Sequence, residues 1–94
     1  MNENQLDEIE LGQKAGVNTS IYDNPEFSWE QMWQIRLGLE EELDVTIYAK
    51  PEFDYHQMEQ IRLRLRKKLD VSIYANTKFT WQQMKEIRIK LSKF

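Results

Sequence analysis

The segment TSIYDNPEFSWEQMWQIRLGLEEELD (residues 19–44) recurs in recognisable form in the next 26 residues, which indicates a repeat protein. Its second copy, VTIYAKPEFDYHQMEQIRLRLRKKLD (45–70), aligns without gaps and is identical at 14 of 26 positions. A third copy, residues 71–94, matches the second at 11 of 24 positions, and a half-copy at residues 5–18 precedes them all. This fixed period predicts that residues 1–94 form a single domain of stacked repeats.

Each repeat predicts one long helix with a well-defined start. The expected N-cap residues are Ser28, Asp54 and Thr80, each followed three positions later by a glutamine, namely Gln31, Gln57 and Gln83. This spacing is typical of a capping box. In the first full repeat, Phe27 before the cap and Met32 inside the helix have the spacing of a hydrophobic staple. Ile35, Leu39 and Leu43 then continue at helical spacing.

The segment between two long helices has two interpretations. A second set of N-cap residues, Asn18, Asp44 and Asp70, favours a short helix in which Val45, Tyr48 and Ala49 share one face. The β-branched and aromatic run Val-Thr-Ile-Tyr instead suits a strand, as in a leucine-rich repeat, although the leucine spacing of that family is missing. We favour the short helix. The predicted fold is therefore all-α, a solenoid-like stack of long helix plus short helix units of undetermined hand.

A broad apolar arc on each long helix predicts the core. In the first full repeat it contains Trp29, Met32 and Ile35, and it is widened by Trp33 and Leu37. An inner helix of a stack is expected to be this wide, because it packs against neighbours on both sides. We therefore expect two aligned rows to be core residues: the methionines Met32, Met58 and Met84, and the aromatics Trp29, Tyr55 and Trp81.

One arginine per repeat falls inside this apolar arc, at Arg36, Arg62 and Arg88. A buried guanidinium needs a partner. We expect these arginines to form a structural ladder between repeats, with Glu10 as the partner of Arg36. The functional alternative is that the row binds a carboxylate or a phosphate of another molecule.

The composition narrows the choice of function. The chain has no cysteine, which excludes disulfides, thiolate chemistry and cysteine-based zinc sites. No apolar run approaches the about 20 residues of a membrane span, and residues 1–10 are too polar for a signal peptide. We therefore expect a cytoplasmic location.

The net charge of −3 conceals two halves of opposite sign. Residues 1–44 hold eleven acids and two bases and carry −9, whereas residues 45–94 hold eleven bases and five acids and carry +6. Such polarity indicates association with another molecule. The candidate partner-binding residues are Arg64, Lys67, Lys68, Lys90, Lys93 and Phe94. Self-association through an exposed C-terminal helix is a further expectation.

No pattern in the chain predicts catalysis. The single histidine, His56, is expected on the solvent side, and no phosphate loop, nucleophile elbow or metal-ligand spacing is present. We therefore predict no enzyme activity, no catalytic residue, no cofactor and no metal.

The motif YAKPEFDYHQMEQIRLRL (48–65) carries a resemblance to a known repeat. It is similar to tandem repeats of about 26 residues in uncharacterised bacterial, phage and mobile-element proteins. The resemblance covers the chain from Gln5 onward, with Thr77 in place of proline in the last copy. It implies a mobile-element accessory protein, such as an inhibitor of a host defence component, and it brings no known catalytic residues.

The sequence thus predicts a non-catalytic protein-binding repeat module. Two alternatives remain open. The basic C-terminal face could bind nucleic acid, or the regularity could be that of a designed consensus repeat whose role is structural.

Overall fold

The capped segments of the sequence form four long helices, and the segments between them form short turns. The computed structural model describes residues 1–68, 71–72 and 74–91. The helices are α1 (Glu3–Ala15), α2 (Trp29–Glu40), α3 (Tyr55–Arg66) and α4 (Trp81–Leu91), with 3₁₀ turns η1 (Thr19–Ile21) and η2 (Val45–Ile47). No strand occurs in the described part of the chain. The predicted all-α stack is confirmed, and the strand alternative is wrong for the two segments between α1 and α3.

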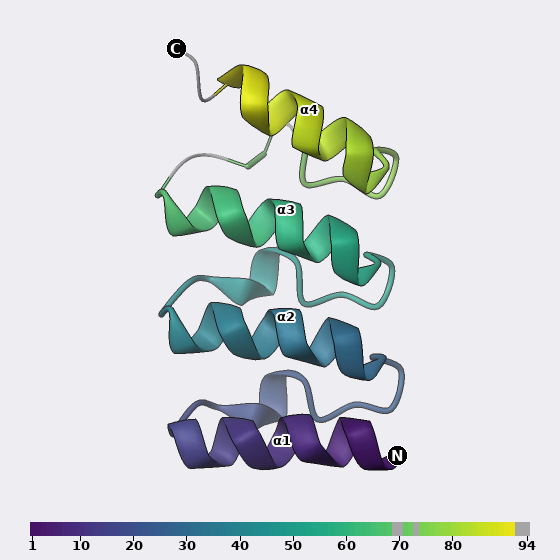
Figure 1. Cartoon of the computed structure of the whole chain (residues 1–94), viewed down its shortest axis with the longest axis vertical. Helices are drawn as coiled ribbons and strands as arrows, with labels where there is room; N and C mark the ends of the chain where they lie inside the picture. Colours follow the sequence, from purple (N-terminus) through teal and green to yellow (C-terminus); the bar gives the residue numbers. More distant parts are fainter. Residues whose placement is uncertain (69–70, 73, 92–94) are drawn as a thin grey trace.

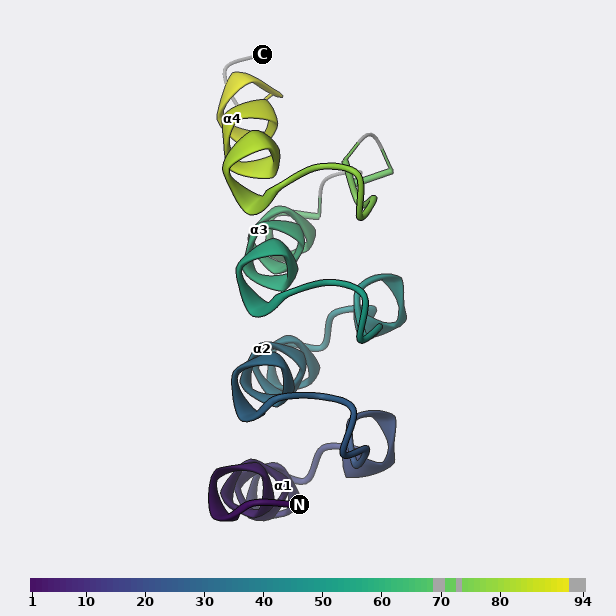
Figure 2. The same cartoon turned by 90° about the vertical axis from the view of Figure 1, so that its right-hand side faces the viewer.

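The long helices lie in one layer, each packed against the next along the stack, with α1 at one end and α4 at the other (Figure 1). Turned by 90°, the molecule shows a second, thinner layer that contains the short turns (Figure 2). The turns cover one side of the helix layer only. We call the uncovered side, which faces the viewer in Figure 1, the outer face.

Capping boxes start the long helices, as the spacing predicts. The side chain of Ser28 accepts a hydrogen bond from the backbone N–H of Gln31, whose side chain accepts one from the backbone of Ser28 in return. Asp54 and Thr80 make the same pair of bonds with the glutamines that follow them. A fourth box begins α1 at Asn2, which the sequence pattern did not predict.

The same glutamines also join successive repeats. Their side-chain amides donate to the carbonyl of the phenylalanine 22 residues later: Gln5 to Phe27 at 2.7 Å, Gln31 to Phe53 at 2.6 Å and Gln57 to Phe79 at 2.6 Å. In each of these glutamines, the side-chain oxygen thus completes the capping box of its own helix. The side-chain nitrogen binds the phenylalanine that precedes the next helix. This connection was not visible in the sequence pattern.

The core lies between the helix layer and the turns. Met32, Met58 and Met84 are fully buried, as expected for the methionine row. Tyrosines from the turn segments complete it: the hydroxyls of Tyr22, Tyr48 and Tyr74 donate to the carbonyls of Glu8, Gln34 and Gln60 at 2.8, 2.7 and 3.1 Å. Burial raises the pKa of Tyr22 and of Tyr74 to about 12 and also raises that of Tyr48. Each of the first three helices, α1, α2 and α3, is therefore held against the segment that follows it by a buried, neutral phenol.

Candidate interaction surface

The arginine row forms a ladder between adjacent helices. The Nε of each arginine donates to the residue 28 positions earlier: Arg36 to Glu8 at 2.6 Å, Arg62 to Gln34 at 2.9 Å and Arg88 to Gln60 at 2.9 Å. These arginines are thus engaged by the preceding repeat, in the arrangement expected of a structural ladder.

The partner expected for Arg36 is corrected by the structure. Arg36 binds Glu8 and Glu40, whereas Glu10 forms a surface ion pair with Lys14 at 3.2 Å. The prediction was wrong because residues at the position of Arg36 point toward the preceding helix, so Glu10 points away from α2. Burial lowers the pKa of Arg36, but its bonds to Glu8 and Glu40 outweigh this effect and raise the pKa overall.

The basic residues expected to bind a partner do not all share one surface. Arg64 is only 8% exposed, so the expectation that it lines an exposed strip is wrong. It occupies the position of Gly12 and Gly38, which is the side of the helix that faces the next turn. Lys67, Lys68 and Lys90 are exposed, while Lys93 and Phe94 lie outside the described residues.

The predicted aromatic core is also corrected. Trp29 and Trp33 are each 37% exposed, and the counterparts of Trp29 in the next two repeats, Tyr55 and Trp81, are partly exposed. These side chains do not belong to the buried core cluster. The apolar arc was too wide because the real core occupies only the side that meets the turns.

A column of aliphatic side chains runs along the outer face, one from each long helix. Leu37 follows the fully buried Ile35 by two residues, which places it about 200° around the helix. Its counterparts occupy the same position in the other three repeats. We call Leu11, Leu37, Leu63 and Ile89 the aliphatic column. Leu11 is 46% and Ile89 41% exposed, and Leu37 and Leu63 are partly buried without packing against the core cluster.

Aromatic rings flank the column at the joint between α3 and α4. The ring of His56 lies 4.0 Å from that of Tyr55 and stacks on Trp81 at 4.9 Å. His56 is therefore partly buried and not simply solvent-facing, as had been expected. Beside this stack, a shallow hollow is lined by Lys85 and Ile89 together with Trp81.

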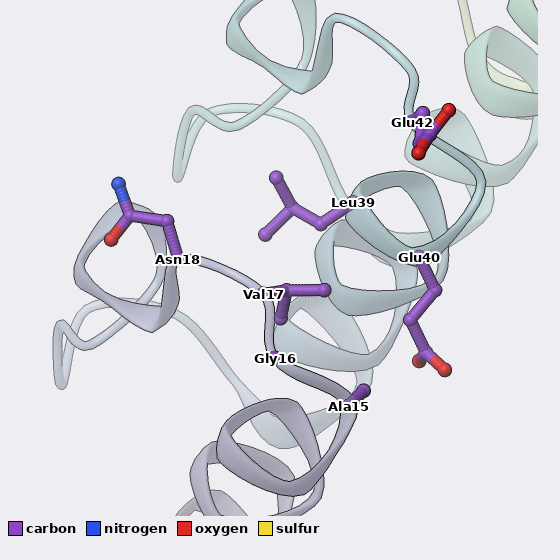
Figure 3. A pocket seen from close by; sticks show the side chains of 7 residues that line it. All are labelled: Ala15, Gly16, Val17, Asn18, Leu39, Glu40 and Glu42. Carbon is purple, nitrogen blue, oxygen red and sulfur yellow. The ribbon is translucent and has the colours of Figure 1, made fainter.

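A second hollow lies where the ends of α1 and α2 meet (Figure 3). Val17 and Leu39 supply its apolar sides, whereas the carboxylates of Glu40 and Glu42 point away from it. Glu40 is already bound to Arg36. The hollow therefore offers no converging polar groups of the kind that a catalytic site requires.

No protein-family model, curated protein or solved structure matches this chain. Its function therefore has to be argued from its own surface. Among the described residues, no group of histidine, aspartate and glutamate side chains is arranged to hold a metal ion. In the same part of the chain, no helix combines the length and the apolar character needed to cross a membrane.

Proposed function

We propose that this chain is a non-catalytic protein-binding repeat module and that its outer face is the binding surface. The aliphatic column is the observation that carries the proposal. A single exposed leucine on a protein surface is ordinary, but here an aliphatic residue recurs at the same position of four consecutive helices, exposed at Leu11 and Ile89 and partly exposed at Leu37 and Leu63. Leu37 and Leu63 are partly buried but do not belong to the core cluster or to the side chains packed against it.

The aromatic residues beside the column support the same conclusion. Trp29 and Trp33 are one helical turn apart on α2 and remain more than a third exposed. Tryptophan is enriched among the few residues that supply most of the binding energy at protein interfaces. A partner that covers the column would bury these rings together with Leu37.

The resemblance to mobile-element repeats supports a more specific role. We propose that the partner is a host protein and that binding inhibits a component of host defence in the cytoplasm. The chain has no cysteine, so its fold does not depend on the oxidising conditions in which disulfides form. Co-expression of the chain with a defence system should restore phage plating, and the variant Leu37→Glu should lose this effect while remaining folded.

The binding surface can be tested by site-specific photo-crosslinking. A photoreactive phenylalanine analogue at position 37 should cross-link a partner in host extract. The same analogue at position 46, an exposed residue of η2 on the opposite side, should not. Equal cross-linking from both positions, or none from position 37, would contradict the proposed surface.

Nucleic acid is the second candidate partner, and one observation favours it. The stack of His56 on Trp81 lies next to Lys85, and aromatic rings beside basic residues can bind unpaired bases. A labelled single-stranded oligonucleotide should then bind at low salt and be released steeply as salt rises. Trp81→Ala should weaken this binding, and the absence of binding at low salt would remove this candidate.

A further inference from the structure

We infer that the partner which covers the outer face is a second copy of this chain, packed in reversed order so that α1 and α2 of one copy lie over α4 and α3 of the other. The inference rests on the proposed function, because it names the occupant of the same surface. The reversed pair has a two-fold axis parallel to the long helices, between α2 and α3. Such an interface is isologous and closes at two copies.

The aliphatic column fits this arrangement. Its four members occupy equivalent positions on successive helices, so they are spaced one helix apart along the stack. Reversal of the second copy therefore places one column over the other. Leu37 of one copy comes to lie near Leu63 of its partner, and Leu11 comes to lie near Ile89. When the two aliphatic columns pack against each other, both copies bury apolar surface without any change in the fold.

Charge selects the reversed order. The half of the chain that contains α1 and α2 carries −9, and the half that contains α3 and α4 carries +6. On the helices beside the column, Asp7 and Glu10 are exposed at one end, and Lys67 and Lys85 toward the other. Reversed packing brings acidic helices to basic ones, whereas α1 on α1 would oppose like charges. A second copy supplies both complementary patches, in the required order, from residues already present.

The dimensions of the molecule are also sufficient. The principal extents are 40 × 23 × 16 Å, and the outer face spans the two longer ones, since Figure 1 is viewed down the shortest axis. A face of 40 by 23 Å slightly exceeds the about 800 Å² that each partner contributes to a standard protein interface.

End-to-end stacking of two copies is disfavoured by the arginine ladder. In the ladder, Glu8 and Gln34 each accept a hydrogen bond from an arginine of the next repeat. Glu86 is the equivalent residue of α4. If α1 of a second copy continued the stack, Glu10 would occupy the arginine position and two carboxylates would meet. Like charges at this distance oppose association. The outer face, and not the uncovered side of α4, is therefore the surface that a second copy fits.

Oligomeric state tests the inference directly. Sedimentation equilibrium over a wide range of protein concentration should show a monomer–dimer equilibrium for the unmodified chain. Leu37→Glu should weaken dimerisation by about tenfold or more, as expected for a residue at the centre of an interface. Thr46→Glu, which places the same carboxylate on the opposite side of the molecule, should leave it unchanged. Circular dichroism should show that both variants remain folded.

A charge-reversal pair tests the order of the helices. One variant carries Asp7→Lys with Glu10→Lys, and the other carries Lys67→Glu with Lys85→Glu. Each alone should dimerise weakly, because the substituted side chains then have the same sign as the side chains that they face in the second copy. An equimolar mixture should recover a dimer that contains one copy of each, since acidic and basic helices again face one another.

The outcomes separate this inference from the proposed function. A chain that stays monomeric, yet cross-links a different protein or an oligonucleotide from position 37, overturns the inference and retains the outer face as a binding surface. The inference is also overturned if Leu37→Glu does not weaken the dimer. It is overturned as well if the two charge-reversal variants do not form a dimer when mixed. A monomer that cross-links nothing from position 37 overturns both.

Discussion

At the scale of single residues, the contact of Gly38 with Tyr48 sets the distance between α2 and the turn that follows it. A Cβ at Gly38 would lie 2.1 Å from the hydroxyl oxygen of Tyr48 and 2.6 Å from a methyl carbon of Val45. Such overpacking costs about 1–3 kcal/mol, which exceeds the at most about 1 kcal/mol gained from the higher helix propensity of alanine. Gly38→Ala should therefore lower the free energy of unfolding, measured in urea. The loss should shrink when Tyr48→Phe removes the clashing oxygen, and equal losses in both backgrounds would contradict this explanation.

The buried phenols predict a loss of stability at alkaline pH. Burial raises the pKa of Tyr22 and Tyr74 from the usual 10.0 to about 12, so the folded chain holds these protons more tightly than the unfolded one. The stability that these two protonated phenols contribute is intact below pH 10 and is lost as the pH rises from about 10 toward 12. Unfolding curves recorded across this range should show falling stability. Tyr22→Phe should make the fall less steep, and a slope unchanged by this variant would argue against the assignment.

At the scale of the element, each capping glutamine serves two helices at once. Gln31→Glu keeps a side-chain oxygen that can accept the capping bond from Ser28, but it removes the amide donor and turns an anion toward the carbonyl of Phe53. The loss of a buried hydrogen-bond donor should cost about 1–3 kcal/mol. The matched control is Gln83→Glu, because Gln83 is exposed and forms a capping box with Thr80. Its cost should stay within about 0.5 kcal/mol. Similar losses in the two variants would show that capping alone is responsible.

The elements also show which features can be predicted from sequence and which cannot. Helix starts could be predicted because a cap such as Ser28 with Gln31 depends on neighbouring residues only. The bond from Gln31 to Phe53 spans 22 residues, and the capping motif looks the same with or without it. Trp33 and Leu37 were assigned to the core because hydrophobicity alone does not distinguish a core face from an exposed binding face. Both residues lie on the proposed binding surface, where the hydrophobic pattern of the sequence and the packing of the folded chain disagree.

At the scale of the whole molecule, stability is expected to decline toward the last described helix. In α2 five residues are buried, and it packs against both α1 and α3. Among the described residues of α4, only Met84 is buried. In α3, which precedes it, Arg64 occupies the position that is glycine in α1 and α2. Because each repeat contacts only its neighbours, a repeat stack can open locally from one end. Backbone amides of α4 should therefore exchange with deuterium faster than those of α2.

Two core truncations test whether this opening is local. Met84→Ala removes a fully buried side chain from α4 and should accelerate amide exchange there, with little change in α1. Met32→Ala removes the equivalent side chain from α2 and should cost about 2–5 kcal/mol, with faster exchange in α1, α2 and α3 together, because both neighbours of α2 lose their support. Hydrogen exchange measured by mass spectrometry resolves the four helices. If Met84→Ala instead accelerates exchange equally in all of them, the stack unfolds as one cooperative unit, and the nearest-neighbour description does not hold for this chain.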